Sequence, residues 1–266
     1  MRGHLFVNPR SGSSGQGPDE LVAEARERGL EVHVLGQGDD VEELARAAEG
    51  DALGMAGGDG SLARVAAVAL ARDLPFVCIP FGTRNHFARD LGLDRDDPVG
   101  ALAAFGGEER RVDVGRVGER VFLNNVSLGI YARLVHQRER HRRRRAALAR
   151  ARALLLAVSH RHESAFTIDG EPVLSRAILV ANNAYELDLF NIGERDQLDG
   201  GLLHVYITHG VLPGSREERS GTSFSIDAAS HRVRAAIDGE PALMTTPLTF
   251  RMEPRALRVL VPPAPG

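Results

Sequence analysis

The sequence has a single cysteine, no lysine and no long apolar run. Cys78 alone can form neither an internal disulfide nor a cysteine-rich zinc site, which is typical of a reduced, intracellular protein. No stretch of the sequence reaches the roughly 18 apolar residues of a membrane-spanning helix, and the apolar run at the amino terminus is too short for a signal peptide. We therefore expect a cytoplasmic protein.

Because lysine is absent, all 33 fixed cations are arginines, whose planar guanidinium groups suit the recognition of phosphate and carboxylate. The formal net charge of −3 argues against a general nucleic-acid binder, which is usually basic overall, so we expect no nucleic-acid partner. With 266 residues, of which 43% are hydrophobic, the chain can bury a sizeable core as one large domain or two modest ones.

The first 110 residues alternate short apolar runs with helical patterns. In the third helical pattern, the apolar positions 62, 65, 66 and 69 have the spacing of one helix face. Such alternation predicts a parallel sheet covered by helices on both sides, and open sheets of this kind bind ligands beyond the carboxyl ends of their strands. The expected strands are 5–7, 32–35, 53–56 and 76–79, and the expected helices are 18–28, 41–49 and 62–72.

Beyond Gly107 the pattern changes to β-like segments, several of them separated by Gly- and Asp-rich turns. We therefore expect an α/β domain over residues 1–111 and a β-rich domain over 112–266, with the last residues able to return to the first domain. One basic helical insert interrupts the second domain at about 133–158. The expected strands are 112–117, 120–126, 177–181, 202–207, 233–237 and 256–261.

A glycine-rich loop, Gly57-Gly-Asp-Gly-Ser61, follows the third predicted strand and opens a predicted helix. Glycine lets the backbone approach a phosphate closely, and the N–H groups at a helix start favour anions. Ser61 can equally cap the helix, which is an ordinary structural role. Asp59 alone would repel a phosphate, so we expect it beside a metal ion or a donor such as a hydroxyl.

Two further loops follow predicted strands in the same way. The loop from Asn8 to Gly15 offers hydroxyl groups, flexible backbone and one guanidinium, and in isolation it is typical of a polar surface loop. After the fourth strand, which Pro80 ends, Thr83 can cap a helix, and Arg84 and Asn85 can contact a ligand. Because parallel strands end at one edge of their sheet, we expect the three loops to converge.

The tetrapeptide Asp-Gly-Glu-Pro occurs at 169–172 and again at 238–241, each time after an isoleucine. Asp-Gly is a strong signal for a two-residue hairpin turn. Glu171 and Glu240 each fit two interpretations, a general base or an exposed hairpin acid, and the local chemistry of the two turns does not separate them.

The three loops, in this order, resemble the catalytic domain of the diacylglycerol kinase family, which includes bacterial lipid kinases and sphingosine kinases. The resemblance implies an N-terminal doubly wound parallel-sheet domain that binds a nucleotide, a C-terminal β-sandwich-like substrate domain, and a cleft between them. It also implies transfer of the γ-phosphoryl group of ATP to a hydroxyl of diacylglycerol or a related lipid, with Mg²⁺ as cofactor. Over nearly the whole chain, further marks of the family follow in its order: Arg111-Val-Asp-Val114, Phe122 to Gly129, Asn182-Asn183, Leu198 to Leu202 and Asp238-Gly-Glu240.

The resemblance also assigns roles to residues. Glu240 would be the general base, and Asp59 and magnesium would organise the phosphates. Asp196 and Asp199 would hold a structural magnesium ion, since magnesium prefers carboxylate oxygens as ligands. The implied contacts with ATP would come from Asn8, Arg10, Ser11, Gly57, Gly58, Gly60, Ser61, Thr83 and Asn85.

Three positions depart from the family pattern, because Ser61 replaces threonine, His86 replaces aspartate and Gly200 replaces an acid. An NAD kinase, which shares the Gly-Gly-Asp-Gly loop, is the nearest alternative enzyme, but Asn182-Asn183 is not followed by the acid expected there. A regulator that binds nucleotide or lipid without catalysis is the alternative that His86 and Gly200 favour.

A run of arginines, Arg142, Arg143, Arg144 and Arg145, lies in the expected helical insert beside an apolar stretch. Such a helix could dock on anionic lipid, where each cation near the surface is worth about 1 kcal/mol. It could equally be a solvated helix face with core leucines. The first alternative predicts peripheral attachment to the inner face of the membrane, and a homodimer stays open.

Overall fold

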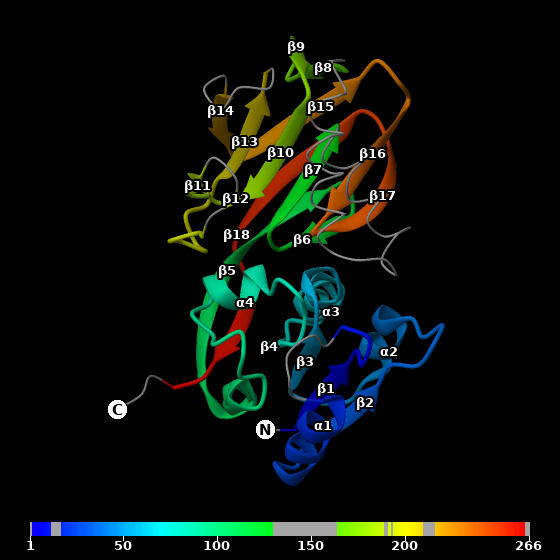
Figure 1. Cartoon of the computed structure of the whole chain (residues 1–266), viewed down its shortest axis with the longest axis vertical. Helices are drawn as coiled ribbons and strands as arrows, with labels where there is room; N and C mark the ends of the chain where they lie inside the picture. The colour runs from blue at the N-terminus through cyan, green and yellow to red at the C-terminus, as the bar shows by residue number, and fades with distance from the viewer. Residues whose placement is uncertain are drawn as a thin grey trace. The chain divides into compact units, whose positions relative to one another are not determined.

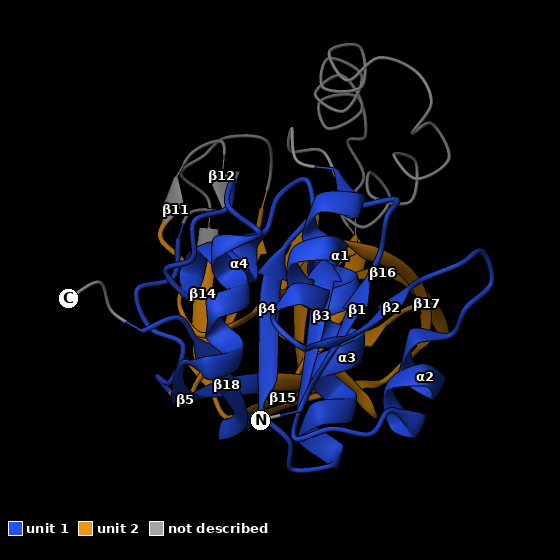
Figure 2. Cartoon of the chain, turned by 90° about the horizontal axis from the view of Figure 1, so that it is seen from below, with its two compact units in different colours: residues 1–114, 193–200, 253–266 blue, residues 115–192, 201–252 orange. Residues whose placement is uncertain are grey.

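The computed structural model of the chain describes residues 2–11, 17–129, 164–188, 191–192, 194–209 and 216–263. The chain divides into two compact units (Figure 2). The expected helical insert, with its arginine run, lies outside the described residues. Unit 1 comprises Met1–Val114, Gly193–Gly200 and Glu253–Gly266, and unit 2 comprises Gly115–Ile192 and Gly201–Met252.

Unit 1 is built on a parallel sheet in the order β2-β1-β3-β4 (Figure 1). The strands are β1 (Gly3–Val7), β2 (Glu31–Val34), β3 (Ala52–Gly57) and β4 (Phe76–Pro80). β3 and β4 are buried along their whole length, which is why the sequence shows them as continuous apolar runs rather than as alternating patterns. The four strands expected in this part of the chain are confirmed.

Three helices connect these strands, namely α1 (Pro18–Glu27), α2 (Val41–Ala47) and α3 (Asp59–Ala71). α3 buries the apolar face that its spacing predicts, with Leu62, Val65, Ala66 and Ala69 fully buried. α1 and the 3₁₀ helix η1 (Gly100–Gly106) share a core cluster with the sheet, whereas α3 packs against β3 and β4. Helices therefore cover the sheet on both faces, as expected (Figure 2).

Unit 2 consists of antiparallel strands whose inward side chains form one core. A six-stranded sheet runs in the order β14-β13-β10-β7-β16-β17, and β15 pairs with both β8 and the first part of β18. Val126 and Val180 from the first group share a core cluster with Phe224 and Phe250 from the second. Most of β5 and of β18 belongs to unit 1, and their remaining residues belong to unit 2. From β5 onward the strands along the chain are β5 (Glu108–Val117), β6 (Arg120–Phe122), β7 (Asn125–Gly129), β8 (Ser164–Ile168), β9 (Glu171–Ser175), β10 (Ala177–Asn182), β11 (Leu187–Asp188), β12 (Asn191–Ile192), β13 (Leu203–Thr208), β14 (Arg216–Gly221), β15 (Ser223–Ala228), β16 (Arg232–Ile237), β17 (Glu240–Thr245) and β18 (Leu248–Val261).

The expected combination of an α/β part and a β-rich part is confirmed, with two differences in detail. The segment expected as one strand over 120–126 forms two, β6 and β7, because the chain turns at Leu123 and Asn124 and their N–H groups donate to Asp238. β18 begins at Leu248, well before the expected residue 256. Its first residues pair with β15 in unit 2, and Val259 and Leu260 pair with β4 in unit 1.

Both Asp-Gly-Glu-Pro segments form tight hairpin turns, which confirms that prediction. Asp169 and Gly170 join β8 to β9 with φ values of 51° and 87°. Asp238 and Gly239 join β16 to β17 with φ values of 46° and 82°. Two successive positive φ values define the type I′ turn, which Asp-Gly favours.

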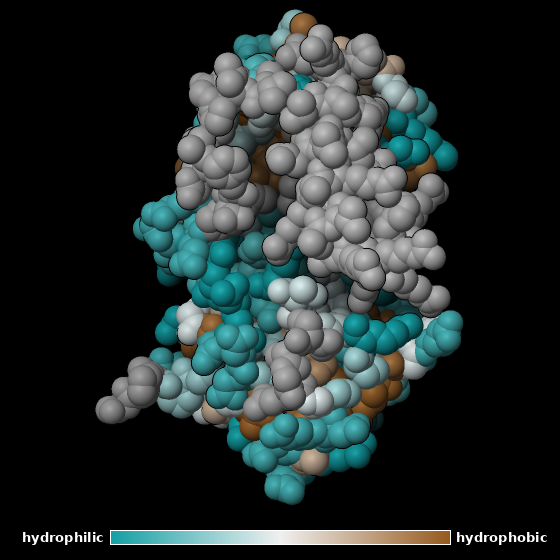
Figure 3. Space-filling model, viewed as in Figure 1, coloured by the Kyte–Doolittle hydropathy of each residue, from teal (hydrophilic) through white to brown (hydrophobic). Residues whose placement is uncertain are grey.

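On the face of the molecule shown in Figure 3, the surface formed by the described residues is mostly hydrophilic, with scattered apolar residues. Among the described residues, the exposed large hydrophobic side chains are Val34, Leu174, Leu202 and Leu243. The described part of the chain contains no helix that is both long and apolar enough to cross a membrane.

Candidate active site

Three loops of unit 1 meet at the carboxyl ends of the parallel strands. From β1 the chain passes to β2 on one side and then returns across β1 to reach β3, so the sheet order reverses between β1 and β3. Open α/β sheets bind ligands at such a reversal, outside the carboxyl ends of the strands. The loops that begin after Val7, Gly57 and Pro80 all start at this edge.

The loop after β1 is shaped by Asn8. The Asn8 side-chain oxygen accepts a hydrogen bond from the Arg10 N–H (3.1 Å), and the Asn8 carbonyl accepts one from the Ser11 N–H (3.1 Å). The exposed Arg10 guanidinium donates to the carbonyl of Gly36, in the loop after β2 (3.3 Å). Asn8 therefore forms the turn, and Arg10 supplies the cation of this loop.

The glycine-rich loop after β3 lies against the loop after β4. A Cβ atom added at Gly82 would lie 2.6 Å from the Cα of Gly58, so no larger residue fits there without moving backbone. A Cβ added at Gly58 itself would meet nothing within 4 Å. The first hydrogen bond inside α3 runs from the Leu62 N–H to the Gly58 carbonyl (3.0 Å), so the N–H groups before Leu62 have no acceptor within the helix. Open space beside Gly58 therefore adjoins the helix start, where an anion is favoured.

Asp59 connects the two loops through hydrogen bonds to backbone groups. Its carboxylate accepts from the N–H of Phe87 (3.1 Å) and from the N–H of His86 (3.4 Å), at the start of α4 (His86–Asp90). The sequence predicts a metal ion or a hydroxyl beside this acid, and the structure places two backbone donors there. These donors compensate part of the negative charge that would otherwise repel a phosphate.

The helix caps differ from those expected. α3 begins at Asp59 with Gly58 as its N-cap, so Ser61 lies inside the first turn and the prediction that it caps the helix is wrong. α4 has Asn85 as its N-cap, so the corresponding prediction for Thr83 is also wrong. Asn85 is 4% exposed, has a φ of 51° and accepts a hydrogen bond from the Gly82 N–H (2.8 Å), which closes the loop on itself.

His86 is half-buried beside this loop, and the exposed Thr83 and Arg84 precede it. Burial lowers the pKa of His86 below 6.5, although the nearby Asp59 carboxylate opposes the shift; Arg89 and Arg84 lower this pKa further. The Nδ1 atom of His86 is buried without a hydrogen-bond partner in the part of the chain that the structure describes. The imidazole is therefore neutral near pH 7, where the family pattern has a negative charge.

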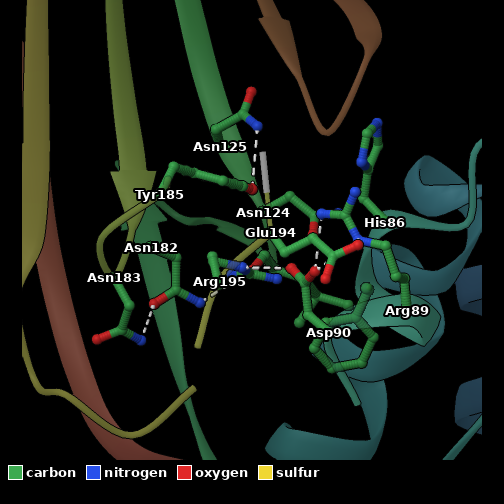
Figure 4. A network of polar contacts seen from close by, with 12 residues as sticks. His86, Arg89, Asp90, Asn124, Asn125, Asn182, Asn183, Tyr185, Glu194 and Arg195 are labelled. Atoms are coloured by element: carbon green, nitrogen blue, oxygen red, sulfur yellow. Dashed lines mark hydrogen bonds and ion pairs between the residues drawn. The ribbon is translucent and has the colours of Figure 1, made fainter. Parts of the chain in front are cut away.

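α4 is held by a buried ion-pair network that the sequence pattern did not reveal. The Nε atom of Arg195 lies 2.6 Å from the Oδ2 atom of Asp90, and both side chains are fully buried (Figure 4). Arg89 contacts the other oxygen of Asp90 at 2.9 Å and lies 3.6 Å from Glu194. Hydrophobic periodicity gives no signal for such a pair, because the partners are far apart in sequence.

The residues expected to hold a structural magnesium ion, Asp196 and Asp199, are both exposed in unit 1. The Oδ2 atom of Asp199 lies 3.2 Å from the guanidinium of Arg255, and Asp196 is exposed. The N–H of Arg255 also donates to the buried Asp113 carboxylate (2.6 Å). Among the described residues no group of three or more His, Cys, Asp or Glu side chains could hold a metal ion. An arginine therefore neutralises Asp199.

Unit 2 contains the two glutamates that the sequence could not separate. Glu240 is exposed at the first position of β17, directly after the turn. Glu171 occupies the same position of the twin hairpin, but its carboxylate lies 2.9 Å from the guanidinium of Arg219. Glu171 is therefore engaged in an ion pair with a residue of the strand β14.

A group of polar side chains on neighbouring strands of unit 2 corresponds to the asparagine motifs. The Asn125 amide donates to the Tyr185 hydroxyl (3.3 Å; Figure 4). The Tyr206 hydroxyl accepts from the Tyr185 N–H (2.9 Å). Asn182 and Asn183 are buried beside each other, with 3.3 Å between their side-chain amides. These residues order the strand ends of unit 2.

The chain is similar to known kinases in sequence and in fold. Residues 2–117 match the family model of the diacylglycerol kinase catalytic domain. The chain is 29% identical to a Pseudomonas aeruginosa protein described as a probable lipid kinase, YegS-like, over 91% of this chain and 88% of that protein. It is 32% identical to a diacylglycerol kinase of Mycobacterium tuberculosis over 42% of this chain and 39% of that protein. The fold is similar to that of a diacylglycerol kinase from Bacillus anthracis, with a TM-score of 0.68, 15% identity, and coverage of 98% of this chain and 96% of that chain.

The matched residues contain all three loops that converge at the carboxyl ends of β1, β3 and β4. The similar fold extends over almost the entire chain, including the strands of unit 2. The resemblance inferred from the loop motifs is thus confirmed. Residues 2–117 therefore carry the sequence pattern of the diacylglycerol kinase catalytic domain.

Proposed function

We propose that the protein is an ATP-dependent lipid kinase that phosphorylates a hydroxyl of diacylglycerol or a related lipid. The observation that carries the proposal is the convergence of three loops at the sheet edge of unit 1, within the residues that match the kinase family. The names of the relatives from Pseudomonas aeruginosa and Mycobacterium tuberculosis support a lipid as the acceptor.

In this proposal the polyphosphate of ATP binds beside Gly58, at the start of α3. The N–H groups of the first turn and the guanidinium of Arg10 would meet the negative charge that develops on the transferred group. ATP would enter as its magnesium complex, and the metal would neutralise part of the phosphate charge. Asn8, Ser11, Thr83 and Asn85 would shape or line the same site, and Asp59 would hold the loops after β3 and β4 together.

The acceptor chemistry would use Glu240. The lipid hydroxyl oxygen attacks the γ-phosphorus, the bond to the β,γ-bridging oxygen breaks, and ADP leaves. Glu240 takes the hydroxyl proton, a role that an exposed carboxylate at a turn can fill. Its twin Glu171 is held by Arg219 at 2.9 Å and takes no part in the reaction.

A lipid acceptor requires access to a membrane, and the arginine run at 142–145 remains the proposed contact with an anionic surface. We propose that the protein is cytoplasmic and attaches to the inner face of the membrane peripherally. The alternative of a regulator that binds nucleotide without transferring phosphate rests on His86, which supplies a neutral imidazole where the family pattern has an acid.

The test is magnesium-dependent ADP release from ATP, measured with diacylglycerol, monoacylglycerol, phosphatidylglycerol, sphingosine and NAD as acceptors. One lipid should stimulate release, and Glu240→Gln should lower kcat by about 100-fold or more, the range for loss of a general base. Glu171→Gln is the matched control and should stay within about twofold, because it removes only an exposed ion pair.

Each other outcome contradicts part of the proposal. Stimulation by NAD alone would identify an NAD kinase. ATP binding without acceptor-dependent ADP release would favour the regulator. Equal losses in Glu240→Gln and Glu171→Gln would remove Glu240 as the base.

A further inference from the structure

The twin Asp-Gly-Glu-Pro turns share their sequence and their backbone conformation, but their aspartates have different surroundings. Asp238 is 7% exposed, and its carboxylate accepts three backbone hydrogen bonds. The donors are the N–H groups of Leu123 (2.8 Å), Asn124 (2.8 Å) and Asn125 (3.0 Å). In the other turn, the Asp169 carboxylate accepts a hydrogen bond from the Ser225 N–H (2.7 Å).

The link that receives Asp238, residues 123–125, has a partner for each of its backbone polar groups. The Asp238 carboxylate accepts from its three N–H groups, and the Asn125 carbonyl accepts from the Asp238 N–H (2.9 Å). The Leu123 carbonyl accepts from the side-chain amide of Asn182 (3.0 Å), and the Asn124 carbonyl accepts from the Asn182 N–H (2.9 Å). The link is therefore fixed on one side by β10 and on the other by the turn before β17.

We propose that Asp238 is a positioning residue for Glu240, and that its bonds to residues 123–125 select Glu240 over its twin Glu171. Glu240 follows Asp238 by two residues, through a turn whose φ values are fixed. Because the Asp238 carboxylate accepts hydrogen bonds from three N–H groups, it fixes the turn at Asp238 and Gly239 to residues 123–125. The backbone position of Glu240 is thereby fixed as well. The chemical consequence rests on the proposed function, because it requires Glu240 to be the proton acceptor.

An asparagine at the two positions should have different effects. The Leu123 N–H donates to one oxygen of Asp238, and the N–H groups of Asn124 and Asn125 donate to the other. In Asp238→Asn the amide NH₂ must face at least one of these donors, which then loses its acceptor. In Asp169→Asn the remaining oxygen can still accept from Ser225, so this variant is the matched control.

The first measurement is amide hydrogen exchange in the intact protein, without ATP or lipid. Asp238→Asn should accelerate exchange of at least one amide among residues 123–125 by about tenfold or more, the factor expected for losing one charge-assisted hydrogen bond. Asp169→Asn should leave these amides unchanged. Unchanged exchange in Asp238→Asn would overturn the anchoring role, whatever reaction the protein catalyses.

The second measurement is a double-mutant comparison of kcat, expressed per molecule that binds ATP. Asp238→Asn should lower kcat by about tenfold or more, with the KM for ATP changed by less than about twofold. Added to Glu240→Gln, it should cause no further loss, because a residue that acts through Glu240 has nothing left to position. A residue that affects the rate independently of Glu240 would instead lower kcat in both backgrounds by the same factor, and that result would overturn the proposal.

The two proposals fail in distinguishable ways. A wild-type protein that transfers no phosphoryl group overturns the proposed function and the catalytic role of Asp238, while the exchange data still decide whether Asp238 anchors the link. If Asp238→Asn does not fold, Asp238→Glu keeps the negative charge and displaces the link by one methylene group. Asp238→Glu is then expected to lower kcat in the wild-type background but not in the Glu240→Gln background. A drop in kcat that persists in the Glu240→Gln background would refute the positioning role.

Discussion

Removing one partner of the buried Asp90–Arg195 ion pair should destabilise unit 1 by several kcal/mol. Both side chains are fully buried, and their closest atoms lie 2.6 Å apart. A charge left in a protein interior without its partner costs about 3–5 kcal/mol. Asp90→Ala leaves the Arg195 guanidinium without the carboxylate that it contacts, so we expect a loss of about 3–5 kcal/mol in the free energy of unfolding.

Arg195→Leu should cost less than Asp90→Ala. Arg89 contacts the second oxygen of Asp90 through two nitrogens, at 2.9 and 3.1 Å, and would continue to neutralise it. We therefore expect about 3 kcal/mol for this variant, the lower end of the range for a broken buried pair. The matched control is Arg46→Ala, because the Arg46–Glu42 pair has a similar distance (2.9 Å) but side chains that are 62% and 34% exposed. A pair of this kind within one helix contributes about 0.3–0.5 kcal/mol.

Urea unfolding followed by far-ultraviolet circular dichroism measures these free energies, since the chain has no tryptophan for fluorescence. Hydrogen exchange of amides in α4 and β4 assigns the loss to unit 1 if the two units unfold separately. Asp90→Leu combined with Arg195→Leu should recover part of the stability, because no buried charge of the pair then remains. The reasoning is refuted if Arg195→Leu loses no more stability than Arg46→Ala.

Two further predictions concern the loops of unit 1. Gly82→Ala should lower the free energy of unfolding by about 1–3 kcal/mol, because the new Cβ collides with the Gly58 backbone. Gly58→Ala should leave the free energy of unfolding almost unchanged, because its Cβ meets nothing within 4 Å. It should instead weaken ATP binding, which calorimetry measures. Burial lowers the pKa of His86, so below about pH 6.5 the unfolded chain binds a proton that the folded chain does not, and stability falls as the pH decreases. His86→Asn should flatten this dependence of the urea midpoint on pH, and an unchanged slope would contradict the assignment.

The framework of unit 1 was predictable because its signals are local. β3 and β4 are buried on both faces and therefore appear as unbroken apolar runs, and α3 shows its buried face as a periodic pattern. The loops after these strands follow from the rule that ligands bind at the carboxyl ends of parallel strands. The two Asp-Gly turns were equally predictable, because the type I′ conformation strongly favours that pair of residues.

The remaining features depend on contacts between residues that are distant in sequence. Ser61 and Thr83 have the composition of helix caps, but the starts of α3 and α4 are set by packing between two loops, so each helix begins elsewhere. β14 consists largely of charged residues and has no alternating apolar pattern, although it pairs along its whole length with β13. The Asp90–Arg195 pair joins positions more than a hundred residues apart, and no local pattern predicts such a pair.

The acid in the Gly-Gly-Asp-Gly motif raises the question of how a carboxylate can lie beside a phosphate site. Asp59 accepts hydrogen bonds from two backbone N–H groups at the start of α4, much as Asp238 accepts three from residues 123–125 in unit 2. In both motifs the acid follows or precedes a glycine and holds a second loop in place. Because its oxygens are directed at N–H groups, the negative charge of Asp59 is partly compensated where a phosphate would approach. The acid is therefore compatible with an anion site because it organises the donors around that site, and its loss should loosen both loops together.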